Sequence, residues 1–401
     1  MRIAISTSVI QRGKTGVGQY VFALVKKLCA YADQHQFTLF VLEEDLPLFA
    51  FAESSMKLVA VPERFRPATK NIAWHQTVLP GLIREHKIEV LHVPSYRRML
   101  WPQPCALVAT IHDLAPFHVA EKYDWKRMFY GRVVVKRLAK RQHKIIGISQ
   151  NTANDIQNFF GLSGTSISVI HNGLDAERFF PGSKNDAATS IAARHGITAP
   201  FFLYVARLEH PAKNHVRLIE AFNLFKAATK SDWRLVFGGS DWHGAQFIHE
   251  QIARSPFRHE IHSLGFVADE DLPTLYRAAD CFIYPSLYEG FGLPPIEAMA
   301  CGCPVISSPR GSLAEIVSDA ALMVDPENVQ DLQKKMSRIS IDSMLRQKLR
   351  EAGTIRSRFF DWSKTAEATL AVYKSAFAQE QNAGRAHISS VTGKLDQTVA
   401  L

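Results

Sequence analysis

Short apolar runs, rich in β-branched and aromatic residues, alternate along the chain with longer stretches of helical periodicity. In the first half of the chain these runs fall at residues 3–7, 38–42, 90–92, 107–111, 144–148 and 168–170. A second series falls at residues 201–205, 234–237, 262–264, 282–284 and 305–307. Strands that alternate with helices are typical of parallel sheets covered by helices. The sequence therefore predicts an α/β protein with two Rossmann-like domains.

Turn-forming residues separate the two series just after the sixth predicted strand. They are Asn172, Gly173, Pro181 and Gly182. The predicted parts of the chain are an N-terminal domain at residues 1–178, a C-terminal domain at 179–380 and a tail at 381–401. The tail is polar and aperiodic, so we expect it to be disordered. Since ligands of open parallel sheets bind at the carboxyl ends of the strands, we expect the loops of both domains to face one cleft.

Composition agrees with this division. A chain of 401 residues, of which 47% are hydrophobic and 21% charged, is long enough for two globular domains. The first residues, MRIAIST, contain no apolar stretch of the length that a signal peptide or a membrane span needs. Five cysteines are scattered without a C-x-x-C pair, so neither a zinc site nor a redox motif is indicated. We expect a cytoplasmic protein with reduced, mostly buried cysteines.

The net charge of +9 comes from the first half of the chain. Residues 1–180 hold 23 Lys and Arg against 14 Asp and Glu, and the rest of the chain holds 24 of each. Nine cations, with aromatic side chains among them, crowd the segment Lys122–Lys144. This mixture favours either a helix that rests on anionic lipid headgroups, at the inner face of the cell membrane, or a solvated helix face. Because no nucleic-acid-binding motif accompanies it, we expect no nucleic-acid partner.

The strongest chemical pattern is the stretch YPSLYEGFGLPPIEAMACGCPV. It places two carboxylates, Glu289 and Glu297, eight residues apart around a glycine-rich helix start. Gly290 and Gly292 permit a tight backbone, and the two prolines that follow suit the first turn of a helix. Free amides at such a helix start bind phosphate, and carboxylates accept hydrogen bonds from sugar hydroxyls. The alternative is an ordinary strand–loop–helix unit in which the glycines serve only the turn.

Two cations and a histidine also follow predicted strands. Arg207 and Lys213 lie six residues apart after the strand at 201–205. Two fixed cations suit a diphosphate, and a surface ion pair is the alternative. His112 follows the strand at 107–111 and is either a structural residue or a group that hydrogen-bonds a ligand.

Two further motifs argue against a nicotinamide dinucleotide site and against a metal site. Gly16 and Gly18 open a predicted helix after the first strand, where backbone amides favour phosphate. Because Val21 stands where the third glycine of G-x-G-x-x-G would be, a nicotinamide-dependent dehydrogenase is disfavoured. Residues 269–271 read D-E-D, but they precede a helical stretch and are predicted to be an N-cap with first-turn acids rather than a metal site.

Together these residues resemble the retaining glycosyltransferases of family 4, enzymes of GT-B architecture that use nucleotide sugars. The Glu-x7-Glu signature of that family matches Glu289 and Glu297. The resemblance covers most of the chain, in the family's order. Its further motifs are Gly16-Val17-Gly18, Thr110-Ile111-His112-Asp113, His171-Asn172-Gly173-Leu174-Asp175, Arg207 with Lys213-Asn214, and Gly311-Ser312-Leu313-Ala314-Glu315.

The resemblance implies a role for each matching residue. Glu297 would hold the ribose hydroxyls, Glu289 would face the transferred sugar, and His112 would lie beside that sugar. Arg207 and Lys213 would neutralise the leaving diphosphate, so neither a metal ion nor another cofactor is expected. The glycine loop of the first domain would close over the donor phosphates. The implied donor-binding residues are Gly16, Gly18, Arg207, Lys213, Glu289, Gly290, Phe291, Gly292, Leu293 and Glu297, and the implied catalytic residues are His112, Glu289, Arg207 and Lys213.

The resemblance thus predicts transfer of a sugar from a nucleotide diphosphate to an acceptor hydroxyl, with retention of configuration and with the donor phosphate taking the acceptor's proton. Residues 311–326 are most similar to family members that transfer mannose in surface-polysaccharide assembly. We therefore expect GDP-mannose ahead of a UDP-sugar as donor, and a lipid-linked saccharide or oligosaccharide as acceptor. The alternatives are a nucleotide-sugar epimerase of the same fold and a catalytically silent binding subunit recruited to the membrane.

Overall fold

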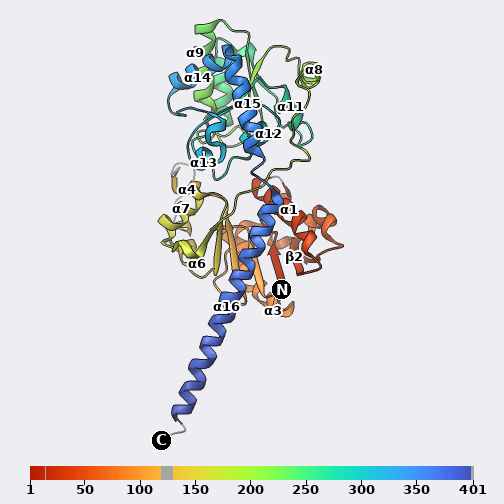
Figure 1. Ribbon diagram of the computed structural model, residues 1–401, viewed down its shortest axis with the longest axis vertical. Helices are drawn as coiled ribbons and strands as arrows, with labels where there is room; N and C mark the ends of the chain where they lie inside the picture. The colour runs from red at the N-terminus through yellow and green to blue at the C-terminus, as the bar shows by residue number, and fades with distance from the viewer. Residues whose placement is uncertain (14, 119–129, 399–401) are drawn as a thin grey trace. The chain divides into compact units, whose positions relative to one another are not determined.

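The computed structural model describes residues 1–13, 15–118 and 130–398 of the chain. The chain folds into two compact units, each built on one parallel sheet (Figure 1). Unit 1 consists of Met1–Asn172 and Trp362–Leu401, and unit 2 consists of Gly173–Asp361. The predicted α/β class with two Rossmann-like sheets is confirmed.

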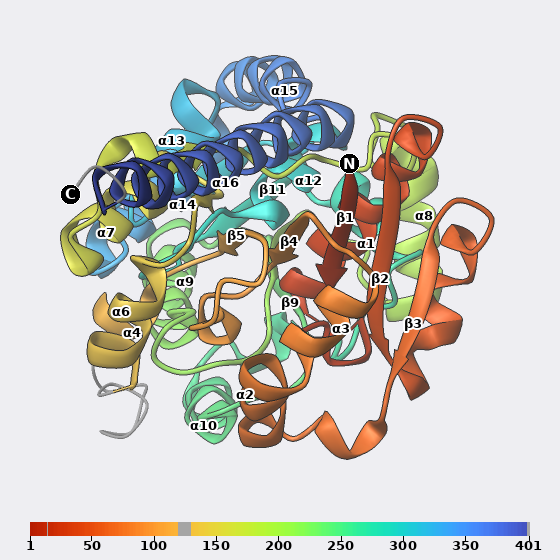
Figure 2. The same cartoon turned by 90° about the horizontal axis from the view of Figure 1, so that it is seen from below.

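Unit 1 contains a seven-stranded sheet with the order β3-β2-β1-β4-β5-β6-β7. The strands are β1 (Arg2–Ser6), β2 (Gln36–Leu42), β3 (Lys57–Val61), β4 (Val90–Val93), β5 (Ala106–Ile111), β6 (Lys144–Gly147) and β7 (Ile167–Val169). All neighbouring pairs are parallel, and Figure 2 shows β3, β2, β1, β4 and β5 side by side. The order reverses between β1 and β4, so right-handed crossovers place helices on both faces.

The described helices of unit 1 are α1 (Gly16–Leu28), α2 (Ala68–Thr77), α3 (Leu79–Glu85), α4 (Ala115–His118), α6 (Lys136–Ala139), α7 (Gln150–Phe160) and α16 (Trp362–Thr398). Successive side chains of β1 alternate between the two faces of the sheet. Ile3 and Ile5 belong to the core cluster with α1 and α16, and Ala4 belongs to the cluster with Trp74 of α2. Strands that are buried on both faces have continuous apolar sequences, which is why the sequence located them.

Helix α16 belongs to unit 1 although it follows unit 2 in the sequence (Figure 1). Its residues Trp362, Ala366, Leu370 and Tyr373 are buried in the cluster that includes residues of β1, β4 and α1. Their spacing of three or four residues places them on one face of the helix. The hydroxyl of Tyr373 is also 2.7 Å from Nδ1 of His92 on β4. The C-terminal helix therefore completes the core of the N-terminal sheet.

The two units differ from the predicted domains in their boundaries. The first boundary falls after Asn172, because Leu174 already pairs with Phe360 and Asp361 inside unit 2. The second falls after Asp361, because the apolar face of α16 packs in unit 1. The helix also continues to Thr398, through residues that the sequence predicts to be disordered.

Unit 2 contains a six-stranded parallel sheet with the order β10-β9-β8-β11-β12-β13. The strands are β8 (Phe201–Val205), β9 (Arg234–Gly238), β10 (Ile261–Ser263), β11 (Cys281–Tyr284), β12 (Val305–Ser307) and β13 (Leu322–Met323). The helices are α8 (Lys184–His195), α9 (His215–Thr229), α10 (Ala245–Arg254), α11 (Leu272–Ala278), α12 (Leu293–Ala300), α13 (Leu313–Val317), α14 (Val329–Ile341) and α15 (Ser343–Ser357). The edge strands β3 and β13 are not among the predicted ones.

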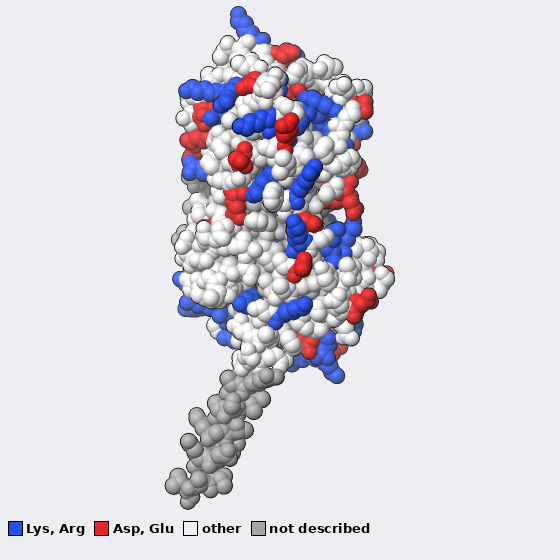
Figure 3. All heavy atoms as spheres, viewed as in Figure 1, with Lys and Arg blue, Asp and Glu red and all other residues white. Residues whose placement is uncertain are grey.

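Among the helices of the described residues, none combines the length and the apolar composition of a membrane span. The basic segment Lys122–Lys144 lies partly outside these ranges, since residues 119–129 are not described. Its contact with anionic lipid stays a prediction. On the face shown in Figure 3, Lys and Arg side chains are interspersed with Asp and Glu.

Candidate functional site

In unit 2 the strand order reverses between the neighbours β8 and β11. The connections from these two strands leave in opposite directions, and ligands of such sheets bind at the carboxyl ends of these strands. Arg207 and Lys213 lie in the loop after β8, and Glu289 lies in the loop after β11. The structure thus brings three of the predicted site residues to one edge of one sheet.

Hydrogen bonds join these two loops into one framework. The Leu287 amide donates to the Ala212 carbonyl (3.1 Å), and the Asn214 side chain donates to the Pro285 carbonyl (3.0 Å). Because backbone groups of both loops are paired in this way, the loops hold each other in place. The side chains between these bonds are therefore fixed relative to one another.

The carboxylate of Glu289 joins both loops. Its Oε1 accepts hydrogen bonds from Nζ of Lys213 (2.6 Å), the Ser286 hydroxyl (2.6 Å) and the Tyr284 hydroxyl (3.0 Å). The Lys213 and Glu289 side chains are only 17% and 15% exposed. Burial raises the pKa of Glu289, but the Lys213 charge and the hydrogen bonds outweigh burial and hold the pKa below its usual value. Glu289 is therefore an ionised, oriented acceptor.

The loop after β12 fixes the backbone of Glu289 from another side. Gly311 has a φ of +61°, and a Cβ atom there would lie 2.4 Å from the Glu289 carbonyl oxygen. The next residue, Ser312, donates its amide to the same oxygen (3.0 Å) and its hydroxyl to the Phe291 carbonyl (2.7 Å). Only glycine permits this approach of two backbones.

Glu297 lies on α12, which starts directly after Gly292 and carries its prolines in the first turn, as predicted. Its Oε2 accepts a hydrogen bond from the Tyr276 hydroxyl (2.9 Å). Burial raises the pKa of Glu297 to about 7, against the lowering effect of the Tyr276 hydrogen bond. The two glutamates therefore differ in charge state: Glu289 is ionised beside a cation, and Glu297 titrates near neutral pH.

Arg207 has different contacts from Lys213. Its guanidinium lies 3.6 Å from the Glu209 carboxylate, and its central carbon lies 4.6 Å from the ring centre of Trp242. Half of the Arg207 side chain is exposed. Arg207 therefore forms a partly exposed ion pair with Glu209, which is close to the predicted alternative of a surface ion pair. Lys213 instead forms a largely buried pair with Glu289. Sequence reasoning missed Trp242, because no local signal shows that the loop after β9 contacts the loop after β8.

In unit 1, Gly16 and Gly18 open α1, as predicted. The Thr15 hydroxyl caps the helix by accepting a hydrogen bond from the Gly18 amide (3.1 Å). A Cβ atom at Gly18 would lie 3.1 Å from the Ile10 carbonyl oxygen, so the absence of a side chain lets the preceding loop pack closely. The contact of these glycines with donor phosphates stays a prediction.

His112 follows β5, as predicted, and its ring packs edge to face against Tyr20 of α1, with centroids 4.7 Å apart. Burial lowers the pKa of His112 to about 4, against the raising effect of a hydrogen bond with the Pro94 backbone. Among the described residues, none hydrogen-bonds the buried Nε2. The Nε2 atom of a neutral imidazole can donate a hydrogen bond to a ligand hydroxyl or accept one from it, depending on the tautomer, but the ring carries no charge.

Two of the three acids at 269–271, Asp269 and Asp271, form ion pairs within unit 2. Asp271 directly precedes α11, the N-cap position, although its side chain pairs with Arg194 rather than with the helix amides. Asp269 lies 3.9 Å from Arg178. In the part of the chain that the structure describes, no three His, Cys, Asp or Glu side chains are grouped to hold a metal ion.

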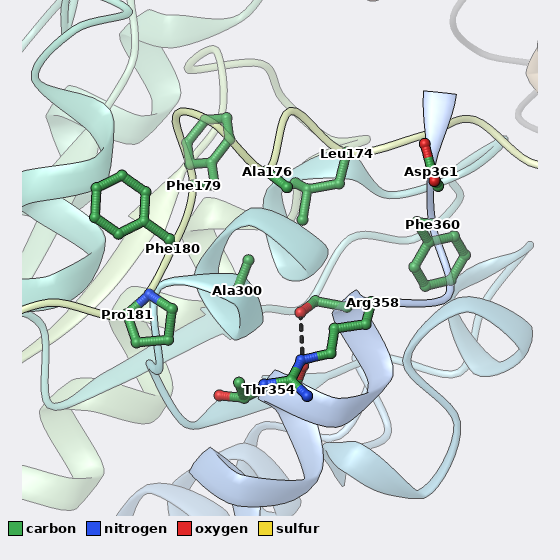
Figure 4. Close-up of a pocket in the computed structure, with 11 residues that line it drawn as sticks. Leu174, Ala176, Phe179, Phe180, Pro181, Ala300, Thr354, Arg358, Phe360 and Asp361 are labelled. Carbon is green, nitrogen blue, oxygen red and sulfur yellow. Dashed lines mark hydrogen bonds between the residues drawn. The ribbon is translucent and has the colours of Figure 1, made fainter. Parts of the chain in front are cut away.

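Unit 2 also contains a pocket of about 330 Å³ (Figure 4). Phe179, Phe180, Phe360 and other apolar side chains form much of its lining, and Arg358 and Asp361 contribute the charges. None of the four predicted polar site residues of unit 2 lines it. The pocket is therefore distinct from the framework around Glu289.

Two family models of glycosyltransferases match successive parts of the chain. A family model described as Glycosyltransferase Family 4 matches residues 14–178, and one described as Glycosyl transferases group 1 matches residues 189–356. The O-antigen chain mannosyltransferase B of Escherichia coli is 27% identical, over 93% of this chain and 100% of its own length.

Solved structures of similar fold cover nearly all of the chain. A sucrose-phosphate synthase from Thermosynechococcus elongatus matches with a TM-score of 0.76 at 21% identity, over 94% of this chain and 100% of its own. Anabaena HepE, solved in complex with UDP and glucose, matches with a TM-score of 0.72 at 19% identity, over 94% of this chain and 100% of its own. These likenesses concern the fold.

Proposed function

The chain belongs to glycosyltransferase family 4, and we propose that it transfers mannose from GDP-mannose to a hydroxyl of a lipid-linked saccharide, with retention of configuration. It is a glycosyltransferase that takes its sugar from a nucleotide donor. The observation that carries the proposed site is the Lys213–Glu289 pair, with Nζ and Oε1 2.6 Å apart where the strand order of unit 2 reverses. A cation and an ionised acceptor side by side suit a ligand that joins a phosphate to a sugar.

The charged residues of this framework have distinct roles in the proposed reaction. Lys213 and Arg207 neutralise the negative charge that develops on the departing diphosphate, which is the main electrostatic need of the reaction. Glu289 holds Lys213 in place and accepts hydrogen bonds from the transferred sugar. The acceptor hydroxyl forms its bond to the sugar on the same face from which the diphosphate leaves, and the departing phosphate takes the hydroxyl's proton, so no side chain has to attack the sugar. Positioning of the reactants then supplies much of the rate.

The choice of mannose is supported by several relatives that are mannosyltransferases. The Escherichia coli protein that matches 93% of this chain is an O-antigen chain mannosyltransferase. The structure with UDP and glucose concerns a protein of 19% identity and supports only a nucleotide-sugar site. A panel of GDP- and UDP-sugars therefore tests the donor, because a ligand that binds only the native protein raises its melting temperature. GDP-mannose is expected to give the largest rise.

Turnover measurements separate the proposed reaction from the alternatives. Incubation of the protein with GDP-mannose and a lipid-linked saccharide should yield a longer saccharide and GDP. Conversion of the nucleotide sugar without acceptor would support the epimerase instead. Donor binding without any turnover would support the silent subunit.

Binding of the nucleoside diphosphate is expected to strengthen as pH rises from 6 to 8. Glu297 has a pKa of about 7, so its carboxylate form, the better acceptor for ribose hydroxyls, becomes dominant across this range. Protonation of that carboxylate weakens binding by up to about tenfold one unit below the pKa. Calorimetry at pH 6, 7 and 8 measures this change.

The matched variants are Glu297→Gln and Glu289→Gln. A phosphate of the ligand also titrates near pH 6 to 7 and contributes to the pH dependence of binding. The readout is therefore the difference in that pH dependence between the wild type and each variant. Glu297→Gln should remove the protein's part of the pH dependence, and Glu289→Gln should retain it, because the pKa of Glu289 lies below its usual value. An unchanged slope in Glu297→Gln would contradict the assignment of Glu297 to the ribose.

Activity is expected to survive excess EDTA. The positive charge that the diphosphate needs comes from Arg207 and Lys213, so a divalent ion has no required place in the proposed reaction. Product formation with and without EDTA, on protein first dialysed against the chelator, measures this. Loss of turnover with EDTA and its return with manganese would show that the two cations do not suffice.

A further inference from the structure

The loops after β8 and β9 continue the parallel pairing of their strands beyond the sheet. The Leu208 amide donates to the Ser240 carbonyl (3.0 Å), and the Trp242 amide donates to the Leu208 carbonyl (3.1 Å). Leu208 thereby pairs with Asp241. Side chains of a pleated backbone alternate between its two faces. Arg207 and Trp242, each one residue away from that pair, therefore lie on the same face.

The close approach of the two loops depends on Gly239. This residue has a φ of +151°, and a Cβ atom at its position would lie 1.9 Å from the Ala206 carbonyl oxygen. No side chain fits there without moving one of the loops. The position of Trp242 beside the loop of Arg207 is thus set by the backbone.

The contact between the two side chains is a cation–π interaction. The guanidinium carbon of Arg207 lies 4.6 Å from the ring centre of Trp242. Both side chains are accessible, since Arg207 is 50% and Trp242 56% exposed. At an exposed site a cation–π contact shifts the equilibrium between the paired and unpaired side-chain positions by about two- to fivefold. It also restricts the rotamers of an arginine, whose freedom would otherwise be lost when a ligand binds.

We propose that Trp242 is a positioning residue of the donor site, which holds the guanidinium of Arg207 where the donor diphosphate binds. The inference rests on the proposed function, in which Arg207 is a phosphate ligand, and it adds a residue that no sequence motif marks. Trp242 acts on the donor only through the Arg207 charge. Its effect should therefore depend on the phosphates of the ligand and be absent for the nucleoside.

The test compares Trp242→Leu with the wild type in calorimetric binding of GDP, UDP and the two nucleosides. Trp242→Leu should raise the Kd of the preferred nucleoside diphosphate about two- to fivefold and leave the Kd of its nucleoside unchanged. Trp242→Phe keeps a ring beneath the cation and should show a smaller rise. Turnover should fall along with affinity in Trp242→Leu, because the leaving group keeps needing the positioned charge.

A double-mutant cycle shows whether Trp242 acts through Arg207. In an Arg207→Ala background, Trp242→Leu should have no further effect on the Kd of the nucleoside diphosphate. The control for loss of an exposed aromatic side chain nearby is Phe247→Leu. Phe247 is 51% exposed, and its ring packs against His210, with centroids 5.3 Å apart. This control should bind both ligands as the wild type does.

Three outcomes would overturn the inference while leaving the proposed function in place. They are an unchanged or lower Kd in Trp242→Leu, a full effect of Trp242→Leu in the Arg207→Ala background, and an equal loss for nucleoside and nucleoside diphosphate. The last two would mean that Trp242 contacts the ligand itself. If the wild type bound neither nucleoside diphosphate, the proposed function would fail, and the inference with it.

Discussion

Replacement of Lys213 by methionine is expected to lower turnover about 100- to 1,000-fold, the usual cost of removing one group that stabilises developing negative charge. Lys213 is the cation that contacts Glu289, with 2.6 Å between Nζ and Oε1 in a largely buried pair. Its removal also leaves Glu289 buried without its countercharge, which destabilises proteins by about 3–5 kcal/mol. Steady-state kinetics and chemical denaturation of the same preparation measure the two effects.

The double variant Lys213→Met with Glu289→Gln separates charge stabilisation from folding. Glutamine has the shape of Glu289 and no charge, so the double variant should regain most of the stability that Lys213→Met loses. Turnover should remain low and should lie well below that of Glu289→Gln alone, because the diphosphate still lacks its cation. Recovery of turnover together with stability would mean that Lys213 only compensates Glu289 and takes no part in the reaction.

Gly311→Ala is expected to lower turnover about 100-fold, although residue 311 carries no functional group. The added Cβ atom would lie 2.4 Å from the carbonyl oxygen of Glu289 and 2.9 Å from its amide nitrogen, so one of the two backbones has to shift. A displacement of about 1 Å in a positioned group can cost about two orders of magnitude in rate. Steady-state kinetics with saturating donor measures the loss.

Gly196→Ala is the matched control for Gly311→Ala. Gly196 has a φ of +68°, close to the +61° of Gly311, but a Cβ atom there would have no neighbour within 4 Å. Both alanines therefore introduce a similar backbone strain, but only the one at residue 311 clashes with the backbone of Glu289. If Gly196→Ala and Gly311→Ala lowered turnover alike, backbone strain and not displacement of Glu289 would explain the loss.

The sequence predicted most of the strands because they are buried on both faces. Residues 201–205 and 305–307 were predicted as strands and are β8 and β12, whose apolar runs lie between two helical layers. It missed β3 and β13. Strand β3 is a largely accessible edge strand, and its apolar run Leu58–Val61 was not assigned to a strand, whereas β13 has only two residues, too few to show a periodicity.

The order of strands and the partner of a helix could not be predicted in the same way. The spacing of Trp362, Ala366 and Leu370 indicates a helix with one buried face, but periodicity does not say which sheet that face covers. The contact between Lys213 and Glu289 could not be predicted for the same reason. The two residues are 76 positions apart, and their contact exists because β8 and β11 are neighbours.

Within the site, the sequence located the charged residues and missed the groups that hold them. Glu289 and Lys213 were found by motif, whereas Tyr284 and Ser286 were not assigned a role, although both donate to the Glu289 carboxylate. These supporting contacts depend on distances in the fold and leave no signature in residue type alone. Serine and tyrosine in a loop have many other uses.

Helix α16 sets the order in which the two units can be completed during synthesis. Nascent chains emerge from the ribosome amino-terminus first, and domains in general fold as units in that order. Here the whole of unit 2 emerges before Trp362, Leu370 and Tyr373, which the core of unit 1 requires. The half of the protein that is made first is therefore finished last. While unit 2 is being made, the sheet of unit 1 therefore has part of its apolar core uncovered, and transiently exposed apolar surface of this kind is what makes nascent chains prone to aggregate.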